Sequence, residues 1–414
     1  MNKYLFSLPM MAAAFGGMLV SCSSDEDLIE TAAYQGQEIE FTLDINSRGN
    51  DVTTENLESI WVYAYSGSGE SAKECFALTE FVRNDYGIFK PETPIKWDSS
   101  WGNEVNFCAF GPTKDNYLHY IQNGVLKSIE QISCKMTPSN PSITINTPEY
   151  ASEMQDMITA ETTVTNGSNG TAIPLKFRHI YSKVDIKVKK AEDSEYDIDV
   201  YGALIAFSTP DTSTDYLYKN YTYRFNQTEN PTYDTNRNGY GVQVSTGTPV
   251  NVTSEEQFAT GEQNSFYIIP QKFESLTFCP YSKPANKYQN LHLLSIVRDK
   301  SGNQIFPTEH DLTITNRVTA NSSALLFQYF NPDPEVEWAK IGRSYIPFGQ
   351  TFEYEAGHHY VITLDLTNGI GYTASTDPEN PDEPVLKMSL GAKVEVEEWV
   401  DGELVPVQAN KDDE

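Results

Sequence analysis

Short runs in which apolar and polar residues alternate are the feature that most constrains how this chain folds. Residues 38–45 read EIEFTLDI, with an apolar residue at every second position: Ile39, Phe41, Leu43 and Ile45. A period of two places the apolar side chains on one face of a half-buried strand. Comparable β-rich runs recur along the whole chain: SIWVYAY, EVNFCAFGP, SITIN, DMITAETTV, IPLKFRHIYSKVDIKV, IDVYGALIAF, SFYIIPQ, SLTFCPYS, HLLSIVRD, HYVITLDL and AKVEVEEWV. Helical periodicity is scarce, so the sequence predicts an all-β protein built from antiparallel β-sandwiches.

Turn and linker signals suggest how these strands are divided. The segment TNGSNGTA, residues 165–172, is rich in Gly and Asn and predicts a hairpin. The charged stretch KKAEDSEYD, residues 189–197, is the best candidate for a linker between domains. Because 414 residues suffice for two sandwiches, we expect an N-terminal domain over residues 38–190 and a C-terminal domain over residues 195–414.

Two regions are not predicted to form strands. Residues 220–253 are polar and rich in Tyr and Asn, so we expect long loops there. Residues 115–132, DNYLHYIQNGVLKSIEQI, are interrupted by Gly124 and stay unassigned between short helix and turn.

The N-terminus has the layout of a secretory leader. Lys3 precedes an uncharged apolar stretch that is too short and too Gly-broken for a membrane span of about 20 residues, so residues 1–21 are predicted to be a signal peptide. The motif LVSC resembles the lipobox of bacterial lipoproteins, which implies that Cys22 receives lipid and becomes the first residue of the mature chain. The alternatives are a cysteine near an ordinary cleavage site, a metal ligand, half of a disulfide or a nucleophile. The acidic SSDED in the predicted tether, residues 22–37, resembles an outer-surface export signal, although a solvated tether explains it equally.

Charge restricts the partners. The chain carries 58 acidic and 29 basic residues, a net charge of −29. Such a chain does not neutralise phosphates, which argues against nucleic acid and against direct binding to anionic lipid. The remaining cysteines are widely spaced, without CxxC pairs, and are expected to be buried small hydrophobic residues rather than disulfides or zinc ligands: Cys75, Cys108, Cys134 and Cys279.

No motif for catalysis stands out. HExxH, G-x-S-x-G, P-loop and EF-hand patterns are absent from the sequence. His358 and His359 are adjacent on a predicted strand and therefore point to opposite faces, so they do not chelate one ion together. His179 lies in an apolar strand and is expected to be a hydrogen-bonded core residue. The acidic segments DSEYDID and NPDPEVE are better explained as solvated loops than as calcium sites. We therefore predict no enzymatic activity, no cofactor and no metal.

Several stretches, in order, resemble the fimbrillin-like surface lipoproteins, a family that includes subunits of type V pili. They are the lipobox, SIWVYAY, PIKW, VNFCAFGP, DMITA, LKFRHIYSKVDIKV, YIIPQ, FEYEAGHHYVITLDL and VEVEEWV. The resemblance covers nearly the whole mature chain. It implies two tandem transthyretin-like β-sandwich domains, with a boundary just after the strand that contains His179.

The resemblance also implies a mode of assembly. Polymerising members are exported as lipoproteins and cut after an arginine, which removes the first strand of the N-terminal domain. An extended strand of the next subunit then fills the groove by β-strand addition. Arg48 in DINSRGND matches that cleavage position and follows the strand predicted over residues 38–46, although an ordinary arginine in a surface turn has the same appearance.

The predicted donor strand is short. After Trp399 the tail has only Leu404, Val405 and Val407 as large apolar residues, and Pro406 lacks a donor for a sheet ladder. This favours a tip or accessory subunit, or a member that does not polymerise.

The sequence therefore supports two functions. The first is a fimbrial subunit or surface adhesin of the outer membrane, whose partners are other fimbrial subunits or itself, and whose receptor is a host or bacterial surface. The alternative is a monomeric lipid-anchored binding protein, either a fimbrial anchor or a module that captures glycans. Tyrosines for sugar stacking would then come from aromatic-rich loops, although packing on a β-surface is the better explanation of these tyrosines: Tyr216, Tyr218, Tyr221 and Tyr223.

Overall fold

A computed structural model of the protein shows a chain of β-strands. The described residues are 36–45, 52, 56–113, 117–122, 125–130, 132–146, 155–165, 172–207, 220–225, 232–233, 242–261, 265–273, 289–309, 311–312, 340–347, 352–373, 385–388, 391–398 and 405–407. Regular structure in these residues is strand, apart from single turns of helix such as Gly69–Ser71 and Ser99–Trp101. The predicted all-β class is confirmed.

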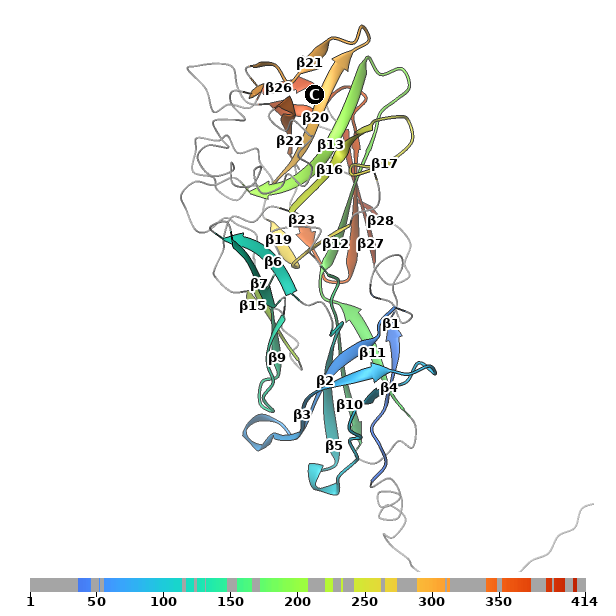
Figure 1. The fold of residues 1–414 in the computed structure, drawn as a ribbon, viewed down its shortest axis with the longest axis vertical. Coiled ribbons are helices and arrows are strands. Elements are labelled where there is room, and N and C mark those ends of the chain that lie inside the picture. Colours follow the sequence, from blue (N-terminus) through green and yellow to red (C-terminus); the bar gives the residue numbers. More distant parts are fainter. Residues whose placement is uncertain are drawn as a thin grey trace, which may run out of the picture.

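The N-terminal strands close into a barrel at one end of the molecule's long axis (Figure 1). In barrel order they are β1 (Phe41–Ile45), β11 (Ile173–His179), β10 (Ile158–Thr165), β5 (Glu104–Gly111), β2 (Ser59–Ser66), β3 (Lys73–Arg83) and β4 (Phe89–Pro91). Alternation gives each strand an inner and an outer face: β11 buries every second residue from Ile173 to His179, while Pro174, Lys176 and Arg178 face outward. Strands β10 and β11, which flank the predicted hairpin, pair antiparallel, whereas residues 166–171 of the hairpin lie outside the described residues.

A four-stranded sheet lies beside the barrel. Its order is β15 (Thr232–Tyr233), β14 (Asn220–Arg224), β9 (Ser142–Asn146) and β8 (Ile132–Lys135). Strands β14 and β15, and the ten-residue strand β16 (Val242–Asn251), lie in the region expected to form loops, so that expectation was wrong for these residues. The unassigned region forms a two-stranded hairpin, β6 (Tyr117–Gln122) with β7 (Val125–Glu130).

Beyond the barrel the chain forms two larger sheets that extend to the other end of the molecule, and a short ribbon that lies near the middle of the long axis (Figure 1). The first sheet contains β17 (Gln257–Phe258), β12 (Ser182–Lys189), β24 (His358–Asp365), β27 (Gly391–Glu398) and β28 (Val405–Val407), with β18 (Phe266–Ile268) also paired to β12. The second contains β16, β13 (Tyr196–Phe207), β20 (Gln289–Asp299), β22 (Gly342–Pro347), β25 (Gly371–Thr373) and β26 (Val385–Met388), with β21 (Gln304–Phe306) on β20. The ribbon pairs β19 (Gln271–Phe273) with β23 (Phe352–Tyr354).

The chain crosses from the barrel to the first C-terminal sheet between Ile180 and Tyr181. The Ile180 N–H donates to the Met157 carbonyl at 3.0 Å, whereas the Tyr181 carbonyl accepts from Gly357 N–H at 2.9 Å. Strand β12 therefore lies in a C-terminal sheet, although the boundary expected from sequence placed it in the N-terminal domain. The charged stretch 189–197 connects β12 to β13 within the C-terminal half.

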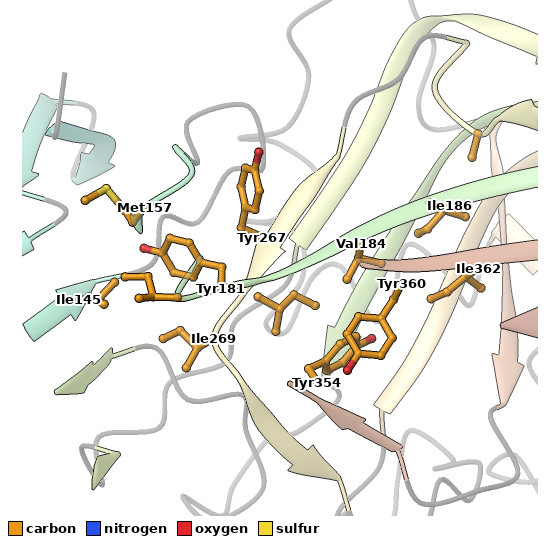
Figure 2. Close-up of a cluster of buried hydrophobic side chains, with 14 of the residues drawn as sticks. Ile145, Met157, Tyr181, Val184, Ile186, Tyr267, Ile269, Tyr354, Tyr360 and Ile362 are labelled. Carbon is orange, nitrogen blue, oxygen red and sulfur yellow. The ribbon is translucent and has the colours of Figure 1, made fainter. Parts of the chain in front are cut away.

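One apolar core spans the crossing. Figure 2 shows Tyr181 between Ile145 and Met157 on the barrel side and Tyr267 and Ile269 on the other. All of these side chains are buried. A second cluster fills the barrel and is rich in fully buried phenylalanines, including Phe41, Phe81, Phe89 and Phe107. The barrel thus has a core of its own and a separate shared core that fastens it to the C-terminal half.

Candidate functional site

The strand that precedes Arg48 is part of a ten-residue segment, residues 36–45, which we call the β1 segment. Its first half pairs antiparallel with residues 95–97. Ile39 N–H donates to the Ile95 carbonyl at 2.8 Å, and Trp97 N–H donates to the Gln37 carbonyl at 3.0 Å. This pairing extends the segment beyond the strand that alternation alone marks.

The second half of the β1 segment pairs with β11. The two strands run parallel, in a register from Phe41 opposite Ile173 to Ile45 opposite Phe177. The Ile173 N–H donates to the Glu40 carbonyl at 2.8 Å. The other described pairings of the barrel are antiparallel. On its far side β1 touches β4 through Phe41 and Phe89, and this contact closes the barrel.

Inward side chains of the β1 segment fill the barrel core. Ile39 is 1% exposed and Phe41 is fully buried. The Phe41 ring meets Phe81 edge-on, with ring centroids 5.0 Å apart, and Phe107 in the same way at 5.3 Å. Full burial of a side chain of this size contributes about 1.5–3 kcal/mol, and each edge-on aromatic pair adds about 0.5–1.5 kcal/mol. The inward side chains of the β1 segment thus complete the barrel core, and in this sense the segment plugs the barrel.

No hairpin ties the β1 segment to the strands beside it. Both neighbours, β4 and β11, come after β2 in the chain, and the covalent connection of β1 leads to β2, which is not its neighbour. Parallel pairing with β11 requires such a long connection. A single break between β1 and β2 would therefore leave the segment attached to the barrel only by hydrogen bonds and apolar packing.

Both predicted modification sites, Cys22 and Arg48, lie outside the described residues. The described residues nearest to Arg48 are Ile45, at the end of β1, and Val52. The Val52 N–H donates to Asp156 Oδ2 at 3.0 Å. Arg48 thus lies in the short stretch between a paired strand and a point where the backbone is held by a buried carboxylate.

Asp156 also contacts His179, the last residue of β11. His179 Nδ1 lies 2.8 Å from Asp156 Oδ2, and both side chains are buried. His179 is therefore the hydrogen-bonded core histidine that its apolar strand predicts. Sequence reasoning did not single out Asp156, because nothing near "EMQDMI" marks one carboxylate among many.

Tyr223 does not offer a surface for sugar stacking. It is 6% exposed, its ring packs edge-on against Phe225 with centroids 5.1 Å apart, and its hydroxyl donates to Glu161 Oε1 at 2.5 Å. The Arg178 guanidinium donates to the same hydroxyl and lies over the ring at 5.5 Å. Burial raises the pKa of Tyr223 to about 12, with the Glu161 hydrogen bond acting in the same direction. Tyr216 and Tyr218 lie outside the described residues, and for Tyr221 the structure describes the backbone pairings with β9 and β15.

His358 and His359 point to different partners, as predicted. His359 Nε2 lies 3.0 Å from Asp185 Oδ2, whereas His358 Nδ1 approaches the Ala356 carbonyl at 3.1 Å. Asp185 is buried and also accepts a hydrogen bond from Ser265. Within the described part of the chain, no group of three His, Cys, Asp or Glu side chains is arranged to hold a metal ion.

The described cysteines lie in three different strands. Cys75 and Cys108 have free thiols, in β3 and β5. Burial raises the pKa of Cys75 to about 11 and raises that of Cys108 well above its ordinary value, so neither thiol is activated as a thiolate. Cys134 is exposed on β8, so the expectation of burial was wrong for this cysteine, and Cys279 lies outside the described residues. Helices long and apolar enough to cross a membrane are not found in the described segments.

Comparison with known proteins shows the family to which the chain belongs. The chain matches the fimbrillin-like family over residues 47–379, which is most of its length. Among solved structures, it is similar to a fimbrial protein from Bacteroides vulgatus, with 15% identity over 85% of this chain and 98% of that one and a TM-score of 0.47. It is also similar to a candidate cell adhesion protein from Bacteroides uniformis, with 11% identity, coverage of 87% and 99%, and a TM-score of 0.40. No curated protein matches. The chain belongs to the fimbrillin-like family.

Proposed function

We propose that this protein is a fimbrial subunit or surface adhesin that assembles by β-strand addition. Cleavage after Arg48 would separate the β1 segment from the rest of the chain. A strand of another subunit would then take its place between β11 and β4. The observation that carries the proposal is that this segment plugs the barrel core without a hairpin to either neighbour.

Departure of the β1 segment would produce the two features that strand addition needs. The hydrogen-bonding edges of β11 and of residues 95–97 would lose their partner. Removal of Ile39 and Phe41 would open an apolar groove onto Phe81 and Phe107. An incoming extended strand satisfies the edges with its backbone and the groove with alternate apolar side chains.

Lipid on Cys22 would have a role in delivery. With the signal peptide and the acidic tether, it would carry the chain to the outer surface of the outer membrane. Cys22 and the β1 segment lie on the same side of Arg48, so cleavage would release the subunit from its anchor at the same step that opens the groove. An uncut chain would keep Cys22 as a permanent anchor.

The C-terminal tail favours an accepting role over a donating one. Strand β28, Val405–Val407, pairs antiparallel with β27 of its own chain, with Pro406 opposite Glu395. To act as a donor, the tail would first have to leave this sheet, and Pro406 would contribute no N–H to a new ladder. We therefore place the protein at a tip, accessory or anchor position rather than in a repeating stalk.

Mass spectrometry of protein released from the cell surface tests the proposal. A mature N-terminus at Gly49 together with oligomers of high mass supports it, and Arg48→Ala is expected to abolish both. A matched control is Arg83→Ala, since this arginine is the last residue of β3 and is not the predicted cleavage position. A monomer that keeps acylated Cys22 would reject assembly after cleavage and would support the alternative of a lipid-anchored binding protein or fimbrial anchor.

A further inference from the structure

The outward side of the β1 segment is acidic at three positions. Ile39 and Phe41 face the barrel interior, so the even-numbered residues between and around them face outward. Three of these are carboxylates, which we call the outward acids: Glu38, Glu40 and Asp44. The fourth, Thr42, is partly buried.

Each outward acid faces a lysine of a neighbouring strand. Glu40 forms an ion pair with Lys90, which follows Phe89 in β4. Glu38 forms a β-bridge with Lys96, and Asp44 is in register with Lys176 of β11. Directly opposed residues on one face of a sheet lie close enough for their side chains to interact. The segment thus sits between charges of opposite sign on both sides, contributed by three flanking lysines: Lys90, Lys96 and Lys176.

The abundance of lysine does not explain this arrangement. Acidic residues outnumber basic ones by 58 to 29 in the whole chain, yet Glu40 pairs with a lysine, and the other two outward acids are in register with lysines and not with carboxylates. The hydrogen bond from Lys90 to Glu40, and the charges of Glu40 and Glu38, raise the pKa of Lys90. Lys90 therefore interacts with two of the outward acids.

We propose that the three flanking lysines select the strand that replaces β1, favouring one with apolar residues at alternate positions and acidic residues between them. The inference rests on the proposed function and adds the chemical class of the partner to it. Without the β1 segment, the lysines would line an empty strand position from both sides. An acidic strand relieves their repulsion, whereas a basic strand adds to it.

The preferred occupant is a strand from a different subunit and not the tail of a second copy. In this tail, Val405, Val407 and Ala409 form one alternating set, and the residues between them, Leu404, Pro406 and Gln408, carry no charge. A strand of residues 404–409 would present no charged side chain to the three flanking lysines. A partner with the pattern of the β1 segment itself would pair with all three.

Peptide exchange into the cut protein tests this inference. The mature chain, with a recognition site for a sequence-specific protease in place of residues 46–50, is cut in the folded state. A fluorescent peptide with the sequence of residues 36–47 then competes with the resident segment, and its entry is followed by anisotropy. The test peptide carries Glu38→Lys, Glu40→Lys and Asp44→Lys. Exposed ion pairs each change affinity by a factor of about 1.4 to 5, so the test peptide should bind roughly 3- to 125-fold more weakly, with the difference shrinking at high salt.

A reciprocal exchange separates charge recognition from general damage. The chain with Lys90→Glu, Lys96→Glu and Lys176→Glu should prefer the basic peptide over the acidic one. The control chain carries three exchanges at exposed lysines away from the β1 segment, Lys73→Glu, Lys135→Glu and Lys300→Glu. It has the same net charge and should keep the preference for the acidic peptide.

The outcomes discriminate between the proposals. A reversal of preference only in the chain with altered flanking lysines supports the inference. Equal binding of both peptides to the unaltered chain overturns it and leaves strand addition intact. Tight binding of a peptide with residues 402–410 would identify the partner as a second copy and would also overturn it. If no peptide enters a chain that is demonstrably cut, strand addition itself fails, and this inference fails with it.

Discussion

Phe41→Ala tests whether the β1 segment is held in the barrel mainly by its inward side chains. Phe41 is fully buried and makes two edge-on ring contacts, at 5.0 and 5.3 Å. Burial of the ring contributes about 1.5–3 kcal/mol, and two aromatic pairs at about 0.5–1.5 kcal/mol each add roughly 1–3 kcal/mol. The sum agrees with the cost of about 3–5 kcal/mol that is typical of Phe→Ala in a core. We expect the free energy of local opening of the segment to fall by that amount.

Hydrogen exchange followed by mass spectrometry measures this opening directly. In the regime where exchange reports the opening equilibrium, amides of residues 36–45 should exchange faster by about a hundredfold to several thousandfold in Phe41→Ala. The control is Thr42→Ala, on the outward side of the same strand, which should change the opening free energy by no more than about 0.5 kcal/mol. Equal exchange in the two variants would refute the reasoning, because it would mean that backbone pairing and not the apolar plug holds the segment.

Two further predictions concern buried carboxylates. Asp156→Ala leaves His179 without its buried carboxylate partner and should lower the stability of the protein by about 3 kcal/mol, measured by chemical denaturation, with a smaller effect for Asp156→Asn. For Asp185, burial raises the pKa, but hydrogen bonds from His359 and Ser265 outweigh it, so the pKa lies below its ordinary value. Its contribution to stability is therefore present above about pH 4 and is lost as pH falls through the lowered folded-state pKa. The melting temperature of Asp185→Asn should consequently fall less steeply below pH 4 than that of the unaltered protein, and parallel pH curves would contradict this assignment.

Local patterns in the sequence were enough to predict the strands but not their partners. The alternation of Ile39, Phe41 and Leu43 predicts a strand because burial on one face needs only a period of two. Its parallel pairing with β11 and the bridge from Glu38 to Lys96 join residues far apart in the chain, and no local pattern encodes them. The expectation of loops over residues 220–253 was wrong for the opposite reason. Pairing of β14 with β9 gives strand structure to a sequence whose Tyr and Asn content suggests loops.

The candidate site, too, was only partly predictable from local patterns in the sequence. Its position before Arg48 follows from the strand pattern and the family resemblance, and the interior role of His179 follows from its apolar strand. Asp156 and the three flanking lysines were not identified, because single charged residues acquire meaning only from their neighbours in the folded barrel. In the sequence, the only sign of this arrangement is the alternation of Glu38, Glu40 and Asp44 with apolar residues. That alternation predicts an acidic outward face of the strand, but not which residues lie opposite this face.

The crossing between the two halves of the molecule explains why a groove would persist after β1 departs. Strand β11 supplies one wall of that groove and continues through Ile180 and Tyr181 into β12. Ile180 is hydrogen-bonded to the barrel, whereas Tyr181 is fully buried in the shared core of Figure 2 and is bonded through its carbonyl to Gly357. Loss of β1 removes one neighbour of β11 and leaves the contacts at this end of the strand in place. A collapse that displaced the end of β11 would also pull Tyr181 out of that core, at a cost of several kcal/mol for a buried aromatic side chain. The shared core thus favours an open acceptor over a collapsed barrel, which is the state that strand addition requires.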